Sequence, residues 1–418
     1  MRMMLCSLLI AGTAVASPSP PAQFGIAPAA AQAILARDPE VLAASAGLNA
    51  ARQDGKSLQQ SPYEWTARAS AQRRNSEPGA RSNEWNAGLE RTLRLPAKGS
   101  ADRQLASATV DQGLARYQIA WRTAALALID AWLEWHAAQE QRALASAHVK
   151  AARENVAAVE KRVRAGDASR LDVSLAQAEL AEQRRLENTA KTAATVALAR
   201  LRARFPGVPE QSVPMPAPAP FLLSSEALRE RIVAASPQLQ EAQAQLRKAS
   251  AQNERARAER IPDPTIGVYT GSEARGQERI TGISLSIPIP GSQRGARANA
   301  ASFSEEMTRH ELDLKKRQLE ADVAAMIATA EGDYEGWQIA ESGAADMRGN
   351  AVLTQRAYVL GEVDLQAMLS ANRLATTAEQ TALTAKAGAA RAYYALLLDA
   401  RLLWDSGTAG PGPDPFAQ

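Results

Sequence analysis

Two long stretches without proline constrain the fold of this chain more than any other feature. No proline lies between Pro96 and Pro206, and none lies between Pro290 and Pro411. Because proline breaks the interior of a helix, stretches on the order of 100 residues without it are compatible with very long helices. Apolar residues recur at helical spacing in the first stretch. A continuous helix from Pro96 to Gly166 would reach on the order of 100 Å.

Glycines mark the ends of these two helices. Gly166 and Gly361 each lie far into a proline-free stretch, and glycine supplies the left-handed residue that ends many helices. After the first glycine we predict a return helix from about Ser169 to Phe205, which would reach roughly 55 Å. Each long helix would then pair antiparallel with its return helix across a short turn.

The two halves of the chain repeat one another. Four landmarks occur in the same order at a nearly constant offset of about 200 residues, which indicates an internal duplication. The matched landmarks are Asp38-Pro39 with Ser236-Pro237, Ser61-Pro62 with Asp263-Pro264, Leu95-Pro96 with Ile289-Pro290, and Gly166 with Gly361. We predict a first repeat at 17–205, a proline-rich connector at 206–220, a second repeat at 221–406 and a flexible tail at 407–418.

Each repeat contains one segment in which apolar and polar residues alternate, as in amphipathic strands. The first predicted hairpin covers about 62–96; over the alternating positions 63–71 and 85–95, Arg91 is the one break in its apolar side. The second covers about 264–290 and is roughly eight residues shorter. Each strand is about long enough to span a membrane.

The N-terminus is typical of a secretory signal peptide. Arg2 supplies a short positive region, an apolar stretch follows from Met3 to Val15, and Ala14-Val15-Ala16 is a cleavage pattern. We predict a signal peptide at 1–16. Cys6, the only cysteine, lies inside the apolar stretch, so we expect neither a lipid anchor there nor a disulfide in the mature chain.

Composition excludes several classes of protein. With 48 basic and 45 acidic residues the net charge is only +3, which is not the footprint of a nucleic-acid-binding protein. Aromatic residues make up 5% of the chain, so we expect no compact aromatic core. No later apolar stretch reaches about 18 residues, so no transmembrane helix is predicted. An exported chain of this kind is either soluble in the periplasm or a β-barrel protein.

Four strands are too few to close a membrane barrel, since small barrels need about eight. Open strand edges in lipid leave backbone groups unpaired, which is costly. Three copies would supply about twelve strands. The predicted fold class is therefore mainly α with a membrane β-barrel: a duplicated protomer that trimerises into this barrel and a periplasmic α-barrel.

The chain resembles the TolC-like outer-membrane efflux factor family over essentially its whole mature length. The resemblance rests on the duplication, the hairpin positions and two turn motifs, at 164–173 (RAGDASRLDV) and 358–365 (YVLGEVDL). The second hairpin, with IPDPTIGV at 261–268 and SLSIPIPG at 284–291, is similar to the cobalt–zinc–cadmium resistance branch. The resemblance implies a homotrimeric passive channel in the outer membrane. It would dock a periplasmic adaptor linked to an inner-membrane pump of the RND type.

In this family the two turns form the periplasmic tip, where the adaptor docks. The resemblance therefore implies docking through Arg164, Ala165, Gly166, Ser169, Leu171, Leu360, Gly361 and Val363. The alternative is that these residues only end helices. Acidic residues near the same turns could form an entrance ring that favours cations, or could only stabilise helix ends. They are Asp167, Asp172, Glu362 and Asp364, of which we expect Asp364 to contribute to a closed gate.

Three aromatic residues of the first hairpin are candidates for membrane-interface anchors, although they could equally pack against neighbouring strands. They are Tyr63, Trp65 and Trp85. The only histidines are His136, His148 and His310, and none has a convincing metal-ligand spacing. We therefore predict no metal site and no cofactor.

Three functions compete for this chain. An enzyme is disfavoured because no nucleophile elbow, phosphate loop or dinucleotide turn occurs. A soluble coiled-coil adaptor would explain the long helices but not the membrane-length strand pairs. The efflux channel explains both. Its substrate stays open between heavy-metal cations, which the branch resemblance favours, and drugs or other small organic compounds.

Overall fold

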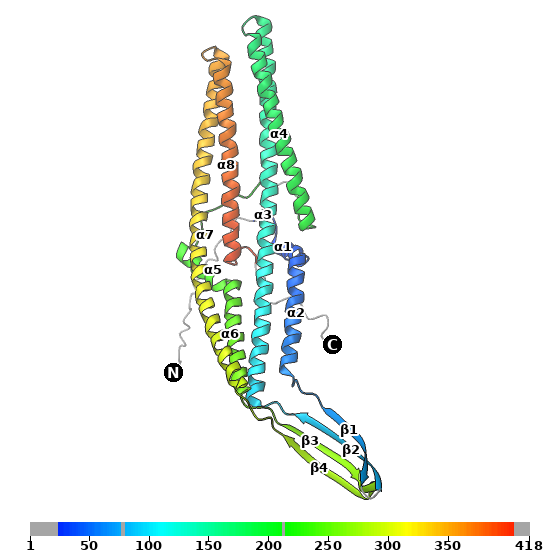
Figure 1. Cartoon of the computed structure of the whole chain (residues 1–418). Coiled ribbons are helices and arrows are strands. Elements are labelled where there is room, and N and C mark those ends of the chain that lie inside the picture. The colour runs from blue at the N-terminus through cyan, green and yellow to red at the C-terminus, as the bar shows by residue number, and fades with distance from the viewer. Residues whose placement is uncertain (1–23, 77–79, 211–213, 405–418) are drawn as a thin grey trace, which may run out of the picture.

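The computed structural model describes residues 24–76, 80–210 and 214–404. The expected signal peptide, Cys6 and the tail at 407–418 lie outside these residues. Within them the chain is long and narrow, with two helical hairpins at one end and a four-stranded sheet at the other (Figure 1). This is the mainly helical architecture with paired strands that the sequence predicts.

The same order of elements occurs in both halves. The first half contains α1 (Pro28–Leu35), α2 (Pro39–Gln59), β1 (Thr66–Ser76), β2 (Ala80–Thr92), α3 (Pro96–Ala165) and α4 (Arg170–Arg204). The second contains α5 (Ser225–Ala235), α6 (Pro237–Ala258), β3 (Thr265–Glu273), the short 3₁₀ helix η1 (Ala274–Gly276), β4 (Glu278–Ser286), α7 (Gln293–Leu360) and α8 (Leu365–Asp399).

The first of the repeated proline landmarks, at Pro39 and Pro237, marks a helix start in each half. At α2 the Asp38 side chain accepts a hydrogen bond of 2.9 Å from the backbone N–H of Glu40, and at α6 the Ser236 hydroxyl accepts one of 3.3 Å from Leu239. Proline follows each cap, where its missing N–H costs no helix bond. The strands differ from prediction at their ends: β1 begins at Thr66 and β4 ends at Ser286. Pro288 and Pro290 beyond β4 cannot donate to a strand ladder.

The sheet has the order β1-β2-β3-β4, and all neighbours are antiparallel. Its register places Val268 opposite both Leu89 and Ile283, so apolar side chains of successive strands share one face. These side chains are exposed, with Ile283 at 86% and Leu285 at 66%. The opposite face is mainly polar, with Ile280 as an apolar exception. Among the residues that the structure describes, β1 and β4 each leave one edge unpaired.

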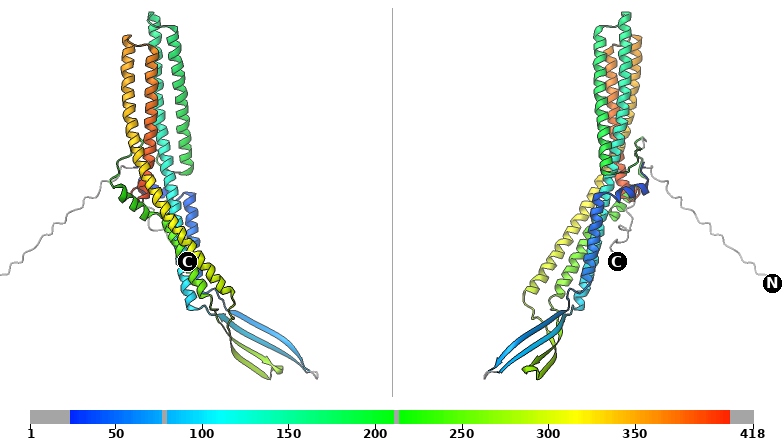
Figure 2. Two further views of the ribbon diagram at one scale, coloured as in Figure 1. Left: turned by 60° about the vertical axis from the view of Figure 1, so that its left-hand side comes forward. Right: turned by 90° about the vertical axis from the view of Figure 1, so that its right-hand side faces the viewer.

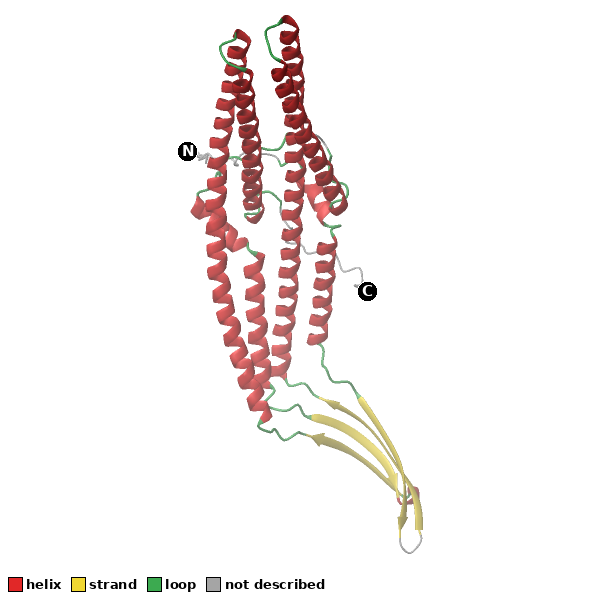
Figure 3. Cartoon of the chain, turned by 45° about the horizontal axis from the view of Figure 1, so that its top comes forward, coloured by secondary structure: helices red, strands yellow, loops and turns green. Residues whose placement is uncertain are grey.

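Helix α3 runs the length of the helical part. It packs against α2 and α6 toward the sheet, and against α4 and α8 toward the other end (Figures 1 and 2). Strands continue from the helix ends and curve away as one layer (Figure 3). In the described part of the chain, no helix combines the length and hydropathy needed to cross a bilayer.

An aromatic core lies midway along the helices, and our expectation of none was wrong. The Phe24 ring centroid lies 4.6 Å from that of Trp132, 4.8 Å from Tyr394 and 5.3 Å from Trp404. A Cβ on Gly25 would lie 2.5 Å from the Trp132 ring, so the chain approaches this ring through a glycine. Aromatic residues are few, but the fold gathers them at one level.

Candidate functional site

The turn between α3 and α4 ends α3 with a left-handed glycine. Gly166 has φ of 86°, and its N–H donates to the carbonyl of Val163 at 3.1 Å. The N–H of Asp167 donates to the carbonyl of Arg162 at 2.9 Å. These two bonds are a Schellman motif, which satisfies carbonyls that the end of α3 would otherwise leave open.

The turn between α7 and α8 has the same geometry. Gly361 has φ of 78°, its N–H donates to the carbonyl of Tyr358 at 3.1 Å, and Glu362 donates to Ala357 at 2.9 Å. Figure 1 shows both turns at the end of the molecule opposite the sheet. The chain therefore presents two matched turns at one tip.

Two of the acidic residues at the tip cap helices. Asp172 and Ser169 form a capping box at the start of α4, with bonds of 2.8 Å and 3.1 Å between each side chain and the other's backbone N–H. Asp364 caps α8, accepting 2.8 Å from the N–H of Ala367. Asp364 remains exposed, as do Asp167 and Glu362, whereas Asp172 is half-buried. Capping and an entrance role are compatible, so the ring stays a prediction.

A small apolar cluster joins the two hairpins just behind the tip. Its buried members are Val159, Ala176, Tyr358, Leu365, Met368 and Leu369, one or more from each of α3, α4, α7 and α8. The guanidinium of Arg162 lies 4.7 Å from the centre of the Tyr358 ring, a cation–π contact between hairpins. The turns are therefore held together. Sequence reasoning missed Arg162 and Tyr358, although Tyr358 opens the second turn motif.

The predicted docking residues divide by exposure. Val363 is half-buried against the apolar cluster, and Leu171 and Leu360 are 67% and 73% exposed. The other five are exposed: Arg164, Ala165, Gly166, Ser169 and Gly361. Large apolar side chains held open at a rigid tip are suited to contact another protein.

An ion pair links the hairpins further from the tip. Arg373 on α8 donates to Glu179 on α4 at 2.7 Å, and Gln183 donates to the other oxygen of Glu179 at 2.8 Å. Glu179 is buried, whereas the Arg373 side chain is 63% exposed. Movement of one hairpin against the other would separate Arg373 from this carboxylate.

A second polar cluster lies where the strands meet the helices. Asp263 accepts hydrogen bonds from Tyr63 at 2.8 Å and the backbone N–H of Leu95 at 3.0 Å, and pairs with Lys98 at 3.0 Å. Burial raises the pKa of Asp263, but the bonds from Lys98, Leu95 and Tyr63 outweigh it and hold this pKa below its ordinary value. The cluster ties β3 to the start of α3.

The three candidate anchor residues are not gathered in one place. Tyr63 belongs to the junction cluster, through its bond to Asp263. Trp65 is 59% exposed with the Arg91 guanidinium 5.4 Å from its ring, and Trp85 on β2 is 50% exposed. Anchoring by all three stays a prediction, and the two tryptophans lie toward opposite ends of the sheet.

The histidines lie in different environments. His136 is buried, with its ring centroid 3.9 Å from that of Trp132. His148 lies 3.0 Å from Glu379, which also pairs with Arg348 at 2.9 Å. Across the described ranges, no three His, Cys, Asp or Glu side chains are grouped so that they could hold a metal ion.

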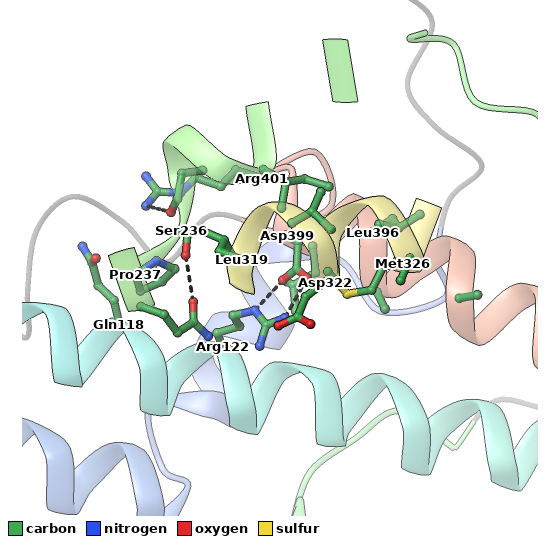
Figure 4. A pocket seen from close by; sticks show the side chains of 18 of the residues that line it. Gln118, Arg122, Ser236, Pro237, Leu319, Asp322, Met326, Leu396, Asp399 and Arg401 are labelled. Carbon is green, nitrogen blue, oxygen red and sulfur yellow. Dashed lines mark hydrogen bonds and ion pairs between the residues drawn. The ribbon is translucent and has the colours of Figure 1, made fainter. Parts of the chain in front are cut away.

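A cavity of about 620 Å³ opens between α3, α5, α6, α7 and α8. One wall is apolar, with Leu319 and Met326, and Arg122 donates to Asp399 at 2.7 Å on another side (Figure 4). The Arg122 side chain is thereby held by a carboxylate of α8. The other charged residues that line the cavity are Lys315, Asp322 and Arg401.

The family model described as outer membrane efflux protein matches residues 30–204 and 228–398. No curated protein sequence matches the chain. Among solved structures, CusC, in a study of its folding and transmembrane channel formation, is similar with a TM-score of 0.74 at 18% identity, over 94% of this chain and 99% of that chain.

Two further channels have the same fold. The open-state MtrE outer membrane channel of Neisseria gonorrhoeae gives a TM-score of 0.72 at 19% identity, over 89% of this chain and 88% of that one. The CmeC outer membrane channel of Campylobacter jejuni gives 0.70 at 13% identity, over 91% and 86%. At these identities the similarity establishes the fold.

Proposed function

The chain belongs to the outer membrane efflux protein family, and we propose that three copies form the exit duct of a tripartite system that exports heavy-metal cations. It is a passive channel of the outer membrane that extends into the periplasm, and it is not an enzyme. The proposal concerns the assembly, the partners and the substrate.

The sheet carries the argument for a trimer. Its apolar face is exposed and its two outer strands each leave an edge open. In lipid, an apolar face is stable but an open edge is not, because its N–H and C=O groups have no water to bind. Further copies close both edges at once when β4 of each pairs with β1 of the next. Three copies give about twelve strands, within the range of known membrane barrels.

The tip supports docking of a periplasmic adaptor, which connects the channel to an inner-membrane RND pump. Its two turns present Leu171 and Leu360 on a rigid base formed by the apolar cluster. A rigid site loses little conformational entropy on binding. In a trimer, three copies of the tip around the threefold axis would each offer this docking contact to the adaptor.

The choice of metal cations rests on two observations. The second hairpin resembles the cobalt–zinc–cadmium branch, as described above. In addition, the polar face of the sheet carries more glutamates than arginines. Its two arginines, Arg68 and Arg74, each lie near a carboxylate. Its four glutamates are Glu84, Glu90, Glu273 and Glu278. A lumen with excess carboxylate favours cations. Drugs or other small organic compounds are the alternative substrate.

Deletion of the gene tests the proposal. The strain lacking it is compared with wild type on cobalt, zinc, cadmium, nickel and copper, and on a panel of antibiotics and detergents. We expect sensitivity to metals alone, restored by the intact gene but not by a Gly361→Ala variant. Sensitivity only to organic compounds would keep the channel and replace the substrate. Unchanged tolerance to every compound would contradict an export role.

A further inference from the structure

One face of the sheet has no acidic residue on its described strand positions. We call this the outward face: positions 67–75 and 81–91 with odd numbers, 266–272 with even numbers and 279–285 with odd numbers. It holds the exposed apolar side chains, including Leu89 and Ile283, and four arginines: Arg73, Arg81, Arg91 and Arg279. On the opposite face Arg68 and Arg74 pair with Glu90 and Glu84 at 2.6 Å and 3.2 Å.

The arginines of the outward face lie at its two ends. Arg91 lies at the helical end beside Trp65. At the other end, Arg279 shares a row across the sheet with Trp85, and Arg73 lies beyond that row. Between the rows of Arg91 and Trp85 the strands run roughly 20 Å at about 3.3 Å per residue. Strands of membrane barrels tilt by about 35–45°, so this stretch would span roughly 15 Å of the apolar band, which is about 25 Å tall in known barrels.

The position of the helices indicates which leaflet of the membrane the far end of the sheet faces. The helices extend into the periplasm, so the end of the sheet away from them lies at the outer leaflet (Figure 3). Arg73 and Arg279 are exposed there, and Arg73 uses its Nε–H to reach Asn83 at 3.2 Å, which holds the guanidinium along the face. A guanidinium binds phosphate oxygens in a bidentate manner.

We propose that Arg73 and Arg279 bind phosphate groups of a phosphorylated glycolipid in the outer leaflet. The proposal rests on the outer-membrane trimer described above. In a closed ring, β4 of each copy lies beside β1 of the next, so Arg279 of one copy and Arg73 of its neighbour are on adjoining strands. Strands are about 4.8 Å apart, so both side chains can reach one phosphorylated headgroup. The site then spans the boundary between copies.

The test measures glycolipid bound to the purified full-length trimer by native mass spectrometry. Wild type is compared with Arg73→Gln/Arg279→Gln and with a charge-matched control, Arg103→Gln/Arg317→Gln, altered at exposed helical positions. Each protein is mixed with a bisphosphorylated glycolipid or with the same glycolipid after enzymatic removal of its phosphates. Channel conductance in bilayers without glycolipid is recorded in parallel.

We expect the sheet variant to bind bisphosphorylated glycolipid roughly tenfold more weakly or worse, and the control to match wild type. Wild type should prefer the phosphorylated form by a similar factor. If the sheet variant does not assemble, Arg73→Lys/Arg279→Lys is measured in its place. The binding of the two glycolipids by wild type is then the second comparison. Equal binding of both lipids by a conducting wild-type channel overturns this inference alone. A wild type that neither trimerises nor conducts overturns it together with the proposed function.

Discussion

Arg373 on α8 and Glu179 on α4 join the two helical hairpins through a bond of 2.7 Å. Because each residue belongs to a different hairpin, the bond exists only while the hairpins stay together. We predict that Arg373→Gln shifts the tip toward an open state. If the link contributes about 1 kcal/mol, the ratio of open to closed channels rises roughly fivefold. Single-channel recording in planar bilayers measures this ratio.

Arg185→Gln is the matched control for this prediction. Arg185 pairs with Glu182 at 2.6 Å, but both residues lie on α4, so the pair does not cross between hairpins. Its loss should leave the open fraction unchanged. Equal effects of the two substitutions would show that lost charge, and not the link between hairpins, controls opening.

Asp364 allows the charge at the tip to be separated from helix capping. Its side chain caps α8, and asparagine caps as well as aspartate, whereas alanine does not. We predict that Asp364→Asn lowers cation selectivity while hydrogen exchange in the first turn of α8 stays as in wild type. Asp364→Ala should lower selectivity and also weaken the cap by about 1 kcal/mol. Reversal potentials in a salt gradient measure selectivity.

The outcome for Asp364→Asn decides the entrance-ring hypothesis. Unchanged conductance and selectivity would leave Asp364 as a helix cap only. Glu362 takes no part in the helix caps described above for Ser169, Asp172 and Asp364. A loss of selectivity equal to that of Glu362→Gln would instead support a ring shared by several carboxylates.

Gly361 and Gly343 should respond to alanine in opposite directions. Gly361 has φ of 78°, where an L-residue is strained by roughly 1–2 kcal/mol. Gly343 lies inside α7 with open space around it, and alanine there should stabilise the helix by about 0.5–1 kcal/mol. Hydrogen exchange of the amides near each position measures these changes. Slower exchange around Gly361→Ala would contradict the strained turn.

Local signals made the helices and turns predictable. From the proline-free stretches and the two glycines, the ends of α3 and α7 could be predicted to within a residue or a few residues. This is possible because helix ends depend on nearby residues. Alternation gave the hairpins in the same way. The trimer was inferred from strand number, since four strands cannot satisfy their own edges in lipid.

Contacts between distant segments were not predictable in this way. The aromatic core combines Phe24, Trp132 and Trp404, which are far apart in sequence. Nothing in the spacing of Arg162 and Tyr358, or of Arg373 and Glu179, indicates that they meet. Such pairs depend on how the hairpins pack, and sequence periodicity describes only which face of each helix is apolar.

Asp263 should make the stability of the junction between strands and helices fall as the pH is lowered. Its pKa is below the ordinary value in the folded chain, because the bonds from Lys98, Leu95 and Tyr63 outweigh burial. The stabilising contribution is therefore complete above the unfolded pKa of about 3.9 and is lost as pH falls through the folded pKa. Asp263→Asn leaves Lys98 buried without its carboxylate, which should cost about 3–5 kcal/mol at pH 7.

We therefore predict that the difference in apparent melting temperature between wild type and Asp263→Asn is largest near neutral pH and shrinks below about pH 4. Tyr63→Phe, which removes one hydrogen bond to Asp263 and no charge, should cost only about 1 kcal/mol at pH 7. Thermal scans of the detergent-solubilised protein from pH 7 to pH 2 measure both variants. A difference that widens on acidification would mean that Asp263 is protonated more readily in the folded chain, and that burial dominates its environment.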